Sequence, residues 1–147
     1  DVNCWKEAPS PSRLPLLTKL HGSINWSRSG ETIYIADPTF HGAHSRHVIL
    51  YPAFKGTPTE QPFNLFHEHL ARVAQASDVV IFVGYAFRDQ YINDVLARSL
   101  PAKARIISIN PNAGLLIPFA GDRETVLVER KFDQDSVLGV QAALEGL

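Results

Sequence analysis

The hydrophobic pattern is strongest in the second half of the chain. Residues 79–84 (VVIFVG) are continuously apolar and rich in β-branched side chains. Such a run is typical of a central strand in a parallel sheet that is covered on both faces. Two more apolar runs, 105–110 (RIISIN) and 125–129 (TVLVE), predict further strands of the same sheet.

Helices are predicted around these strands. Apolar residues recur at helical spacing over 63–76, where no glycine or proline occurs. Asp89 is a good N-cap for a helix over 90–99, and a last helix is expected over 133–144. This order of strands and helices predicts an α/β fold with a doubly wound, Rossmann-like parallel sheet.

The beginning of the chain has a different pattern. Residues 1–13 are rich in proline and polar residues, and we expect a linker from an upstream part of the protein. Residues 14–21 (LPLLTKLH) predict a buried strand with His21 at its carboxyl end. An inserted segment is expected at about 25–46, with a half-exposed strand at 32–37, and another strand at 47–52.

Composition narrows the function classes. The 147 residues carry a formal net charge of −1, and the basic residues are scattered, so neither nucleic acid nor an anionic membrane is an expected partner. One cysteine, Cys4, excludes an internal disulfide or a cysteine zinc cluster within the chain. No apolar run reaches the roughly 20 residues that span a bilayer, and a cytoplasmic location is expected.

Candidate chemistry follows from the strand ends, because ligands of an open parallel sheet bind beyond the carboxyl ends of its strands. Three such ends are expected to converge on one crevice: His21-Gly22-Ser23, the loop from Gly84 through Tyr85 and Ala86 to Asp89, and Asn110. Glycines allow a ligand close to the backbone, a helix N-terminus suits a phosphate, and the Asn110 amide suits ribose hydroxyls. Each residue also has a purely structural explanation, such as a turn or a helix cap.

Histidine clusters suggest other sites. His41, His44 and His47 are spaced three apart, but no carboxylate follows Asp37 in this segment, and we expect no metal there. His67, Glu68 and His69 are expected to form a solvated helix face.

Three motifs resemble sirtuin-like domains, especially their bacterial branch. They are LTKLHGSINW at 17–26, VVIFVGYAFRDQYIND at 79–94 and IISINPN at 106–112, in the order and spacing of that family. The resemblance implies an NAD-consuming domain, needs no metal, and covers the chain from about Leu14 onward. It also suggests a bacterial defence protein, with NAD or ADP-ribose as ligand and a possible homo-oligomer.

The resemblance also implies residue roles. His21 matches the general base, which takes a proton from a ribose hydroxyl or from water. Gly84 and Tyr85 match positions that hold the NAD phosphates and ribose, and Asn110 matches the contact to the adenosine ribose. The remaining matched cofactor positions are Gly22, Ser23, Ala86, Asp89, Phe132 and Asp133.

The chain also departs from the family. Ala86 replaces the usual serine, and the Gly-Ala-Gly and Asn-Asp motifs and the four-cysteine zinc module do not occur. We therefore expect the C-terminal portion of the domain, completed by a missing N-terminal half, and favour NAD hydrolysis. The alternatives are a deacylase or ADP-ribosyl transferase, and a non-catalytic module that senses NAD or ADP-ribose.

Overall fold

The computed structural model describes residues 17–35, 46–50, 58–112, 114 and 116–145. The chain forms two compact units, residues 1–68 and 69–147, and the boundary falls inside the first helix. Each unit has its own sheet. The predicted linker at 1–13 lies outside the described residues.

The sheet of the first unit is antiparallel. It consists of β1 (Gly22–Ser29), β2 (Thr32–Ile35) and β3 (Arg46–Ile49), in the order β2-β1-β3. Ser29 pairs with Thr32, so Gly30 and Glu31 form a two-residue hairpin loop, in which Gly30 has a φ of 57°. The strands expected within 32–37 and 47–52 are thus found as β2 and β3, whereas β1 was not predicted.

The core of this unit forms between the sheet and the start of α1 (Phe63–Gln75). Val48 of β3 and Phe63 and Phe66 of α1 are buried, and Trp26 and Phe66 have ring centroids 5.7 Å apart. The helical spacing read in the sequence places both phenylalanines on one face.

The predicted solvated face of this helix is wrong for His67. Its side chain is only 3% exposed, and Nδ1 lies 2.7 Å from the carbonyl oxygen of Phe63, one turn earlier. Burial is tolerated because the ring nitrogen is hydrogen-bonded.

The predicted strand at 14–21 is also wrong over its described part. Residues 17–21 form no strand, Leu17 is 78% exposed, and the chain turns where the Gly22 amide donates to the carbonyl of Lys19. An apolar run does not distinguish a strand from an irregular segment, and the turn is imposed by Gly22. His21 therefore directly precedes a strand instead of ending one.

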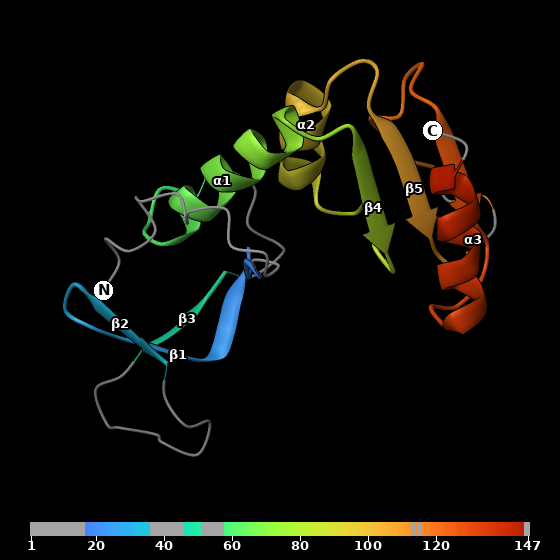
Figure 1. Ribbon diagram of the computed structural model, residues 1–147. Coiled ribbons are helices and arrows are strands. Elements are labelled where there is room, and N and C mark those ends of the chain that lie inside the picture. The colour runs from blue at the N-terminus through green and yellow to red at the C-terminus, as the bar shows by residue number, and fades with distance from the viewer. Residues whose placement is uncertain (1–16, 36–45, 51–57, 113, 115, 146–147) are drawn as a thin grey trace. The chain divides into compact units, whose positions relative to one another are not determined.

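The second unit confirms the α/β prediction. Its parallel sheet contains β4 (Val79–Val83), β5 (Arg105–Ile109) and β6 (Thr125–Val128), in the order β4-β5-β6. Between β4 and β5 lies α2 (Gln90–Ser99), and α3 (Gln134–Glu145) follows β6. Figure 1 shows β4 and β5 side by side and α3 beside β5. All three predicted strands and both helices of this region are found.

The central strand, however, is β5. Every residue of β5 is buried, with Ile106 and Ile107 at 0% exposure. Among the described residues β4 pairs only with β5, and its Ile81 and Val83 are 44% and 49% exposed. The prediction that residues 79–84 form the central strand, covered on both faces, is thus wrong within this sheet.

Arg123 binds the C-terminal end of α2 through hydrogen bonds. Its guanidinium donates to the carbonyl oxygens of Leu100, Pro101 and Phe119 at 2.7, 2.9 and 2.8 Å. A side chain with five donors is suited to three main-chain acceptors at once. The C-terminal end of α2 is thereby tied to the segment that leads into β6.

Candidate functional site

The loop that follows β4 begins with an accessible glycine. Gly84 has a φ of 65°, and among the described residues no atom beyond its chain neighbours lies within 4 Å of the position that a Cβ would take. Its amide donates to the carbonyl of Ile109 at 2.9 Å, which fixes the loop to the end of β5. Open space over an anchored backbone fits the close approach of a ligand.

Asn110 joins this loop to the next strand end. Its Nδ2 donates to the carbonyl oxygen of Tyr85 at 3.2 Å, and its Oδ1 accepts from the amide of Asn112 at 2.9 Å. The predicted meeting of the Gly84 and Asn110 strand ends is therefore confirmed. Both polar atoms of the Asn110 side chain, Nδ2 and Oδ1, are thus hydrogen-bonded within the protein, and each can form one more hydrogen bond.

Tyr85 directs its hydroxyl into the protein. The hydroxyl donates to Oδ1 of Asn93 at 3.3 Å. Burial, and secondly the charge of Asp89, raise the pKa of Tyr85 to about 12. Near neutral pH the phenol is therefore protonated and acts as a donor.

An aromatic cluster packs the loop against the rest of the second unit. Phe82 of β4 lies 5.2 Å from Phe87 and 5.7 Å from Phe119, measured between ring centroids, and Tyr85 lies 4.7 Å from Phe87. Phe87 and Phe119 are buried. Edge-to-face packing of this kind fixes ring positions as well as burying apolar surface.

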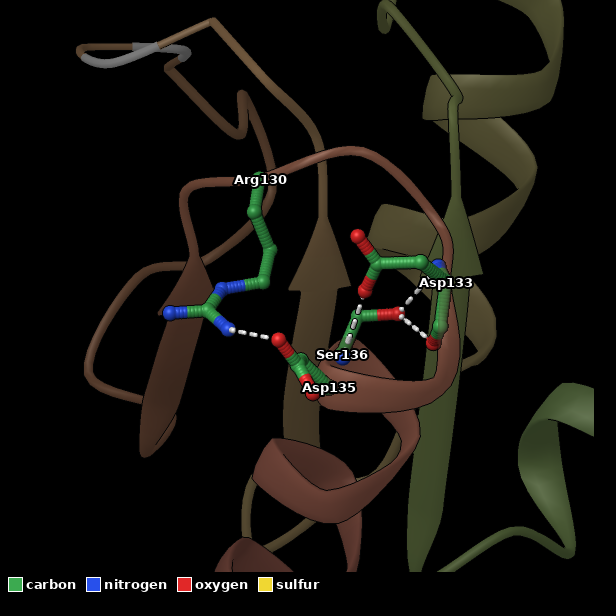
Figure 2. A network of polar contacts seen from close by, with 4 residues as sticks. All are labelled: Arg130, Asp133, Asp135 and Ser136. Atoms are coloured by element: carbon green, nitrogen blue, oxygen red, sulfur yellow. Dashed lines mark hydrogen bonds and ion pairs between the residues drawn. The ribbon is translucent and has the colours of Figure 1, made fainter.

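Two of the predicted cofactor residues cap helices. Asp89 accepts from the amide of Ile92 at 3.1 Å and is the N-cap of α2. At the start of α3, Asp133 accepts from the amide of Ser136 at 2.9 Å, and Ser136 Oγ accepts from the amide of Asp133. Figure 2 shows this reciprocal pair beside the Arg130–Asp135 ion pair. Each carboxylate takes one of the helix-end amides that a phosphate would otherwise use.

Two predicted residues present exposed side chains. Phe132, directly before the cap of α3, is 63% exposed, and Ala86 is exposed in the Gly84 loop. An exposed aromatic ring near the strand ends is suited to stacking on a base. At Ala86 there is no hydroxyl to bind a ligand.

His21 lies in the first unit, in the turn before β1. Its carbonyl accepts from the amide of Leu50 at 2.9 Å, and the side chain is half-buried. Lys19 Nζ donates to Ser23 Oγ at 3.1 Å, so Ser23 is engaged within the same turn. That His21 joins the Gly84 loop in one crevice stays a prediction, because the two lie in different units.

Gly22 is required by packing. Its φ is 77°, and a Cβ would lie 2.0 Å from the carbonyl oxygen of Val48. Only glycine allows the turn to contact β3 this closely. The glycine of the His-Gly pair therefore has a structural role in setting the backbone of His21.

Two residues of the site were missed in the sequence. Asn93 is 3% exposed and hydrogen-bonds to the loop, and Phe87 has a φ of 54° within it. The available signal was the position of Asn93 beside the inward-facing Ile92, one turn after the cap residue Asp89. A polar residue there predicts a buried amide with partners in the preceding loop.

The histidine cluster at which no metal is expected is described only in part. His41 and His44 are outside the described residues, and His47 is exposed on β3. Within the described ranges, no three histidine, cysteine or acidic residues are grouped so that they could hold a metal. In the same part of the chain, no helix is long and apolar enough to cross a membrane.

Comparison with known proteins identifies the family. The profile of the SIR2-like domain matches residues 1–136, which is most of the chain. No curated protein matches. The match includes the His21 turn, the Gly84 loop and Asn110. The chain thus belongs to the SIR2-like domain family, whose members engage NAD.

Proposed function

We propose that the protein binds NAD and cleaves its nicotinamide glycosidic bond. The observation that carries the proposal is the joined loop pair at the carboxyl ends of β4 and β5, where Asn110 binds the Tyr85 carbonyl and none of the described residues fills the space over Gly84. This edge is where open α/β sheets bind nucleotides. The family match supports NAD as the nucleotide.

The described residues fit such a ligand. Gly84 lets a diphosphate or ribose approach the backbone, and the exposed Phe132 ring is available for the adenine. Asp89 and Asp133 cap their helices, so they act on the ligand through the loops that they hold. We assign the phosphate contacts to the backbone of these loops.

His21 is the proposed general base. When the C–N bond breaks, nicotinamide leaves with the bonding electrons and positive charge develops on the ribose. Water then attacks the anomeric carbon and its proton passes to the imidazole of His21. An acyl oxygen or a protein side chain in place of water would make the same site a deacylase or transferase.

The test compares nicotinamide release from NAD by the full-length protein and its His21→Ala variant. A loss of at least about 100-fold is expected, because general base catalysis contributes on that order. The matched control is His47→Ala, an exposed histidine of the same unit. It should release nicotinamide at the original rate.

Other results would point to the alternatives. Equal release by the His21→Ala variant and the unaltered protein would rule out His21 as the base. NAD binding without release by either protein would indicate a sensing module, which the missing hydroxyl at Ala86 favours. Faster consumption of NAD on addition of an acylated peptide would indicate deacylation.

A further inference from the structure

Asn93 is a buried amide whose hydrogen bonds reach into the Gly84 loop. It lies in α2 and is 3% exposed. Nδ2 donates to the carbonyl oxygen of Phe87 at 2.8 Å, and Oδ1 accepts from the Tyr85 hydroxyl at 3.3 Å. One side chain thus holds the loop at two residues, and at 3% exposure it reaches a ligand only through that loop.

The carbonyl that Asn93 binds belongs to a strained residue. Phe87 has a φ of 54°, in the left-handed region that bulky residues rarely adopt. Such a conformation persists only where the surroundings enforce it. Here the Asn93 bond adds to the rings of Phe82, Tyr85 and Phe119, which pack around Phe87.

The opposite side of the loop is held by Asn110. Its Nδ2 donates to the carbonyl oxygen of Tyr85, whose hydroxyl is held by Asn93. Tyr85 is therefore fixed at its main chain from the end of β5 and at its side chain from α2. A loop held from two elements pays little ordering cost when a ligand binds.

We propose that Asn93 is a positioning residue that preorganises the loop from Gly84 to Asp89 for its nucleotide ligand. The role of this loop as a ligand site rests on the proposed function. The two hydrogen bonds by which Asn93 holds the loop, here called the Asn93 clamp, exist in the protein without ligand. The clamp and the ligand site are therefore tested separately.

The first experiment measures amide hydrogen exchange of residues 85–89 in the ligand-free, full-length protein. Asn93→Leu removes both hydrogen bonds at similar volume, and Asn93→Asp keeps the acceptor for Tyr85 but loses the donor to Phe87. Exchange is expected to speed up by about tenfold in Asn93→Asp, as for the loss of one buried hydrogen bond, and by more in Asn93→Leu, which loses both. The control is Val95→Ala, which opens space in the same helix at a residue 6% exposed. This variant should speed up amide exchange within α2 and leave exchange of residues 85–89 unchanged.

The second experiment measures NAD affinity and turnover. Asn93→Leu should weaken NAD binding by about tenfold and raise KM more than it lowers kcat, because the loop must be ordered again on binding. Val95→Ala should lower the melting temperature without this change in KM.

A spectroscopic signature separates positioning from general stability. The Tyr85 phenol donates to Asn93, so Asn93→Leu removes the acceptor of that hydrogen bond and should shift the near-ultraviolet absorption of the phenol. Val95→Ala should not. If Asn93→Leu does not fold, Tyr85→Phe removes one of the two bonds and should give a smaller change in loop exchange in the same direction.

The outcomes are distinct. If the Asn93 variants and Val95→Ala change loop exchange and KM in proportion to their loss of stability, Asn93 has no positioning role. Altered loop exchange in a protein that does not bind NAD would refute the proposed function and leave the clamp in place. Equal NAD affinity of the Asn93 variants and the unaltered protein would overturn the inference about Asn93 and leave the proposed function standing.

Discussion

A Cβ on Gly22 would lie 2.0 Å from the carbonyl oxygen of Val48, and the residue has a φ of 77°. Gly84 shares the left-handed backbone, but in the described part of the chain no atom beyond its neighbours lies within 4 Å of its missing Cβ. The first glycine is thus required by the packing of the turn on β3, and the second leaves space above its loop. Glycine therefore permits close packing in the first motif and leaves the backbone accessible in the second.

Tyr85 should make stability depend on pH in the alkaline range. Its pKa is raised from 10.0 to about 12 in the folded protein, chiefly by burial. Between these values the unfolded chain has already lost the proton that the folded chain keeps, so fewer protons are bound in the unfolded state and stability falls as pH rises. This contribution is fully present below pH 10 and is lost by about pH 12.

Urea unfolding between pH 9 and 12 would measure this effect, with Tyr85→Phe as the comparison. Phenylalanine keeps the ring and has no proton to lose, so its stability should decline less steeply over that interval. Parallel declines would show that Tyr85 is not the group responsible.

At the scale of elements, the start of α3 offers a matched pair of acidic residues. Asp133 caps the helix through the Ser136 amide, whereas Asp135 makes an exposed ion pair with Arg130 at 3.9 Å. Asp133→Ala should lower the free energy of unfolding by about 1 kcal/mol. Asp135→Ala should cost about half of that or less.

Chemical denaturation of the two variants is the measurement. A cost at Asp135 equal to that at Asp133 would mean that the negative charge near the helix end matters more than the cap. The cap geometry of Figure 2 predicts the opposite.

Helices and parallel strands were predictable because their signals are local. Periodicity located α1, and Asp89 marked the start of α2 correctly. β1 was missed, and the preceding apolar run was assigned as a strand. The reason is that the turn at Gly22 depends on contact with β3, more than twenty residues later in the sequence. Such non-local contacts leave no periodic signal.

At the scale of the molecule, strand order was the least predictable property. The sequence of a five-residue apolar strand is compatible with a central position and with an edge position in a sheet. Only the pairing with neighbouring strands decides between the two. Candidate residues were found where strand ends coincide with family motifs, as at Gly84 and Asn110. Asn93 was overlooked because its partners, Tyr85 and Phe87, become neighbours only through the left-handed turn of the loop.

The central position of β5 in the sheet can be tested with two isoleucines that lie side by side on neighbouring strands. Ile107 of β5 is fully buried, and its partner in register, Ile81 of β4, is 44% exposed. Ile107→Ala should cost about 2–5 kcal/mol of unfolding free energy, and Ile81→Ala about 1 kcal/mol or less. The unfolding transitions of the full-length variants would give both values. Equal costs would mean that β4 is covered by another part of the protein.

The anchoring of α2 has a consequence for how the protein responds to alkali. The carbonyl oxygens of Leu100 and Pro101 at its C-terminal end accept from the guanidinium of Arg123, and guanidinium groups in proteins are not deprotonated. Near its N-terminal end, the Tyr85 hydroxyl that meets Asn93 is lost as a donor near pH 12. In strong base one end of α2 therefore keeps its contacts with Arg123, whereas the other loses the Tyr85 hydrogen bond and keeps the one from Asn93 to Phe87. The ligand loop should loosen at Tyr85 and stay held at Phe87.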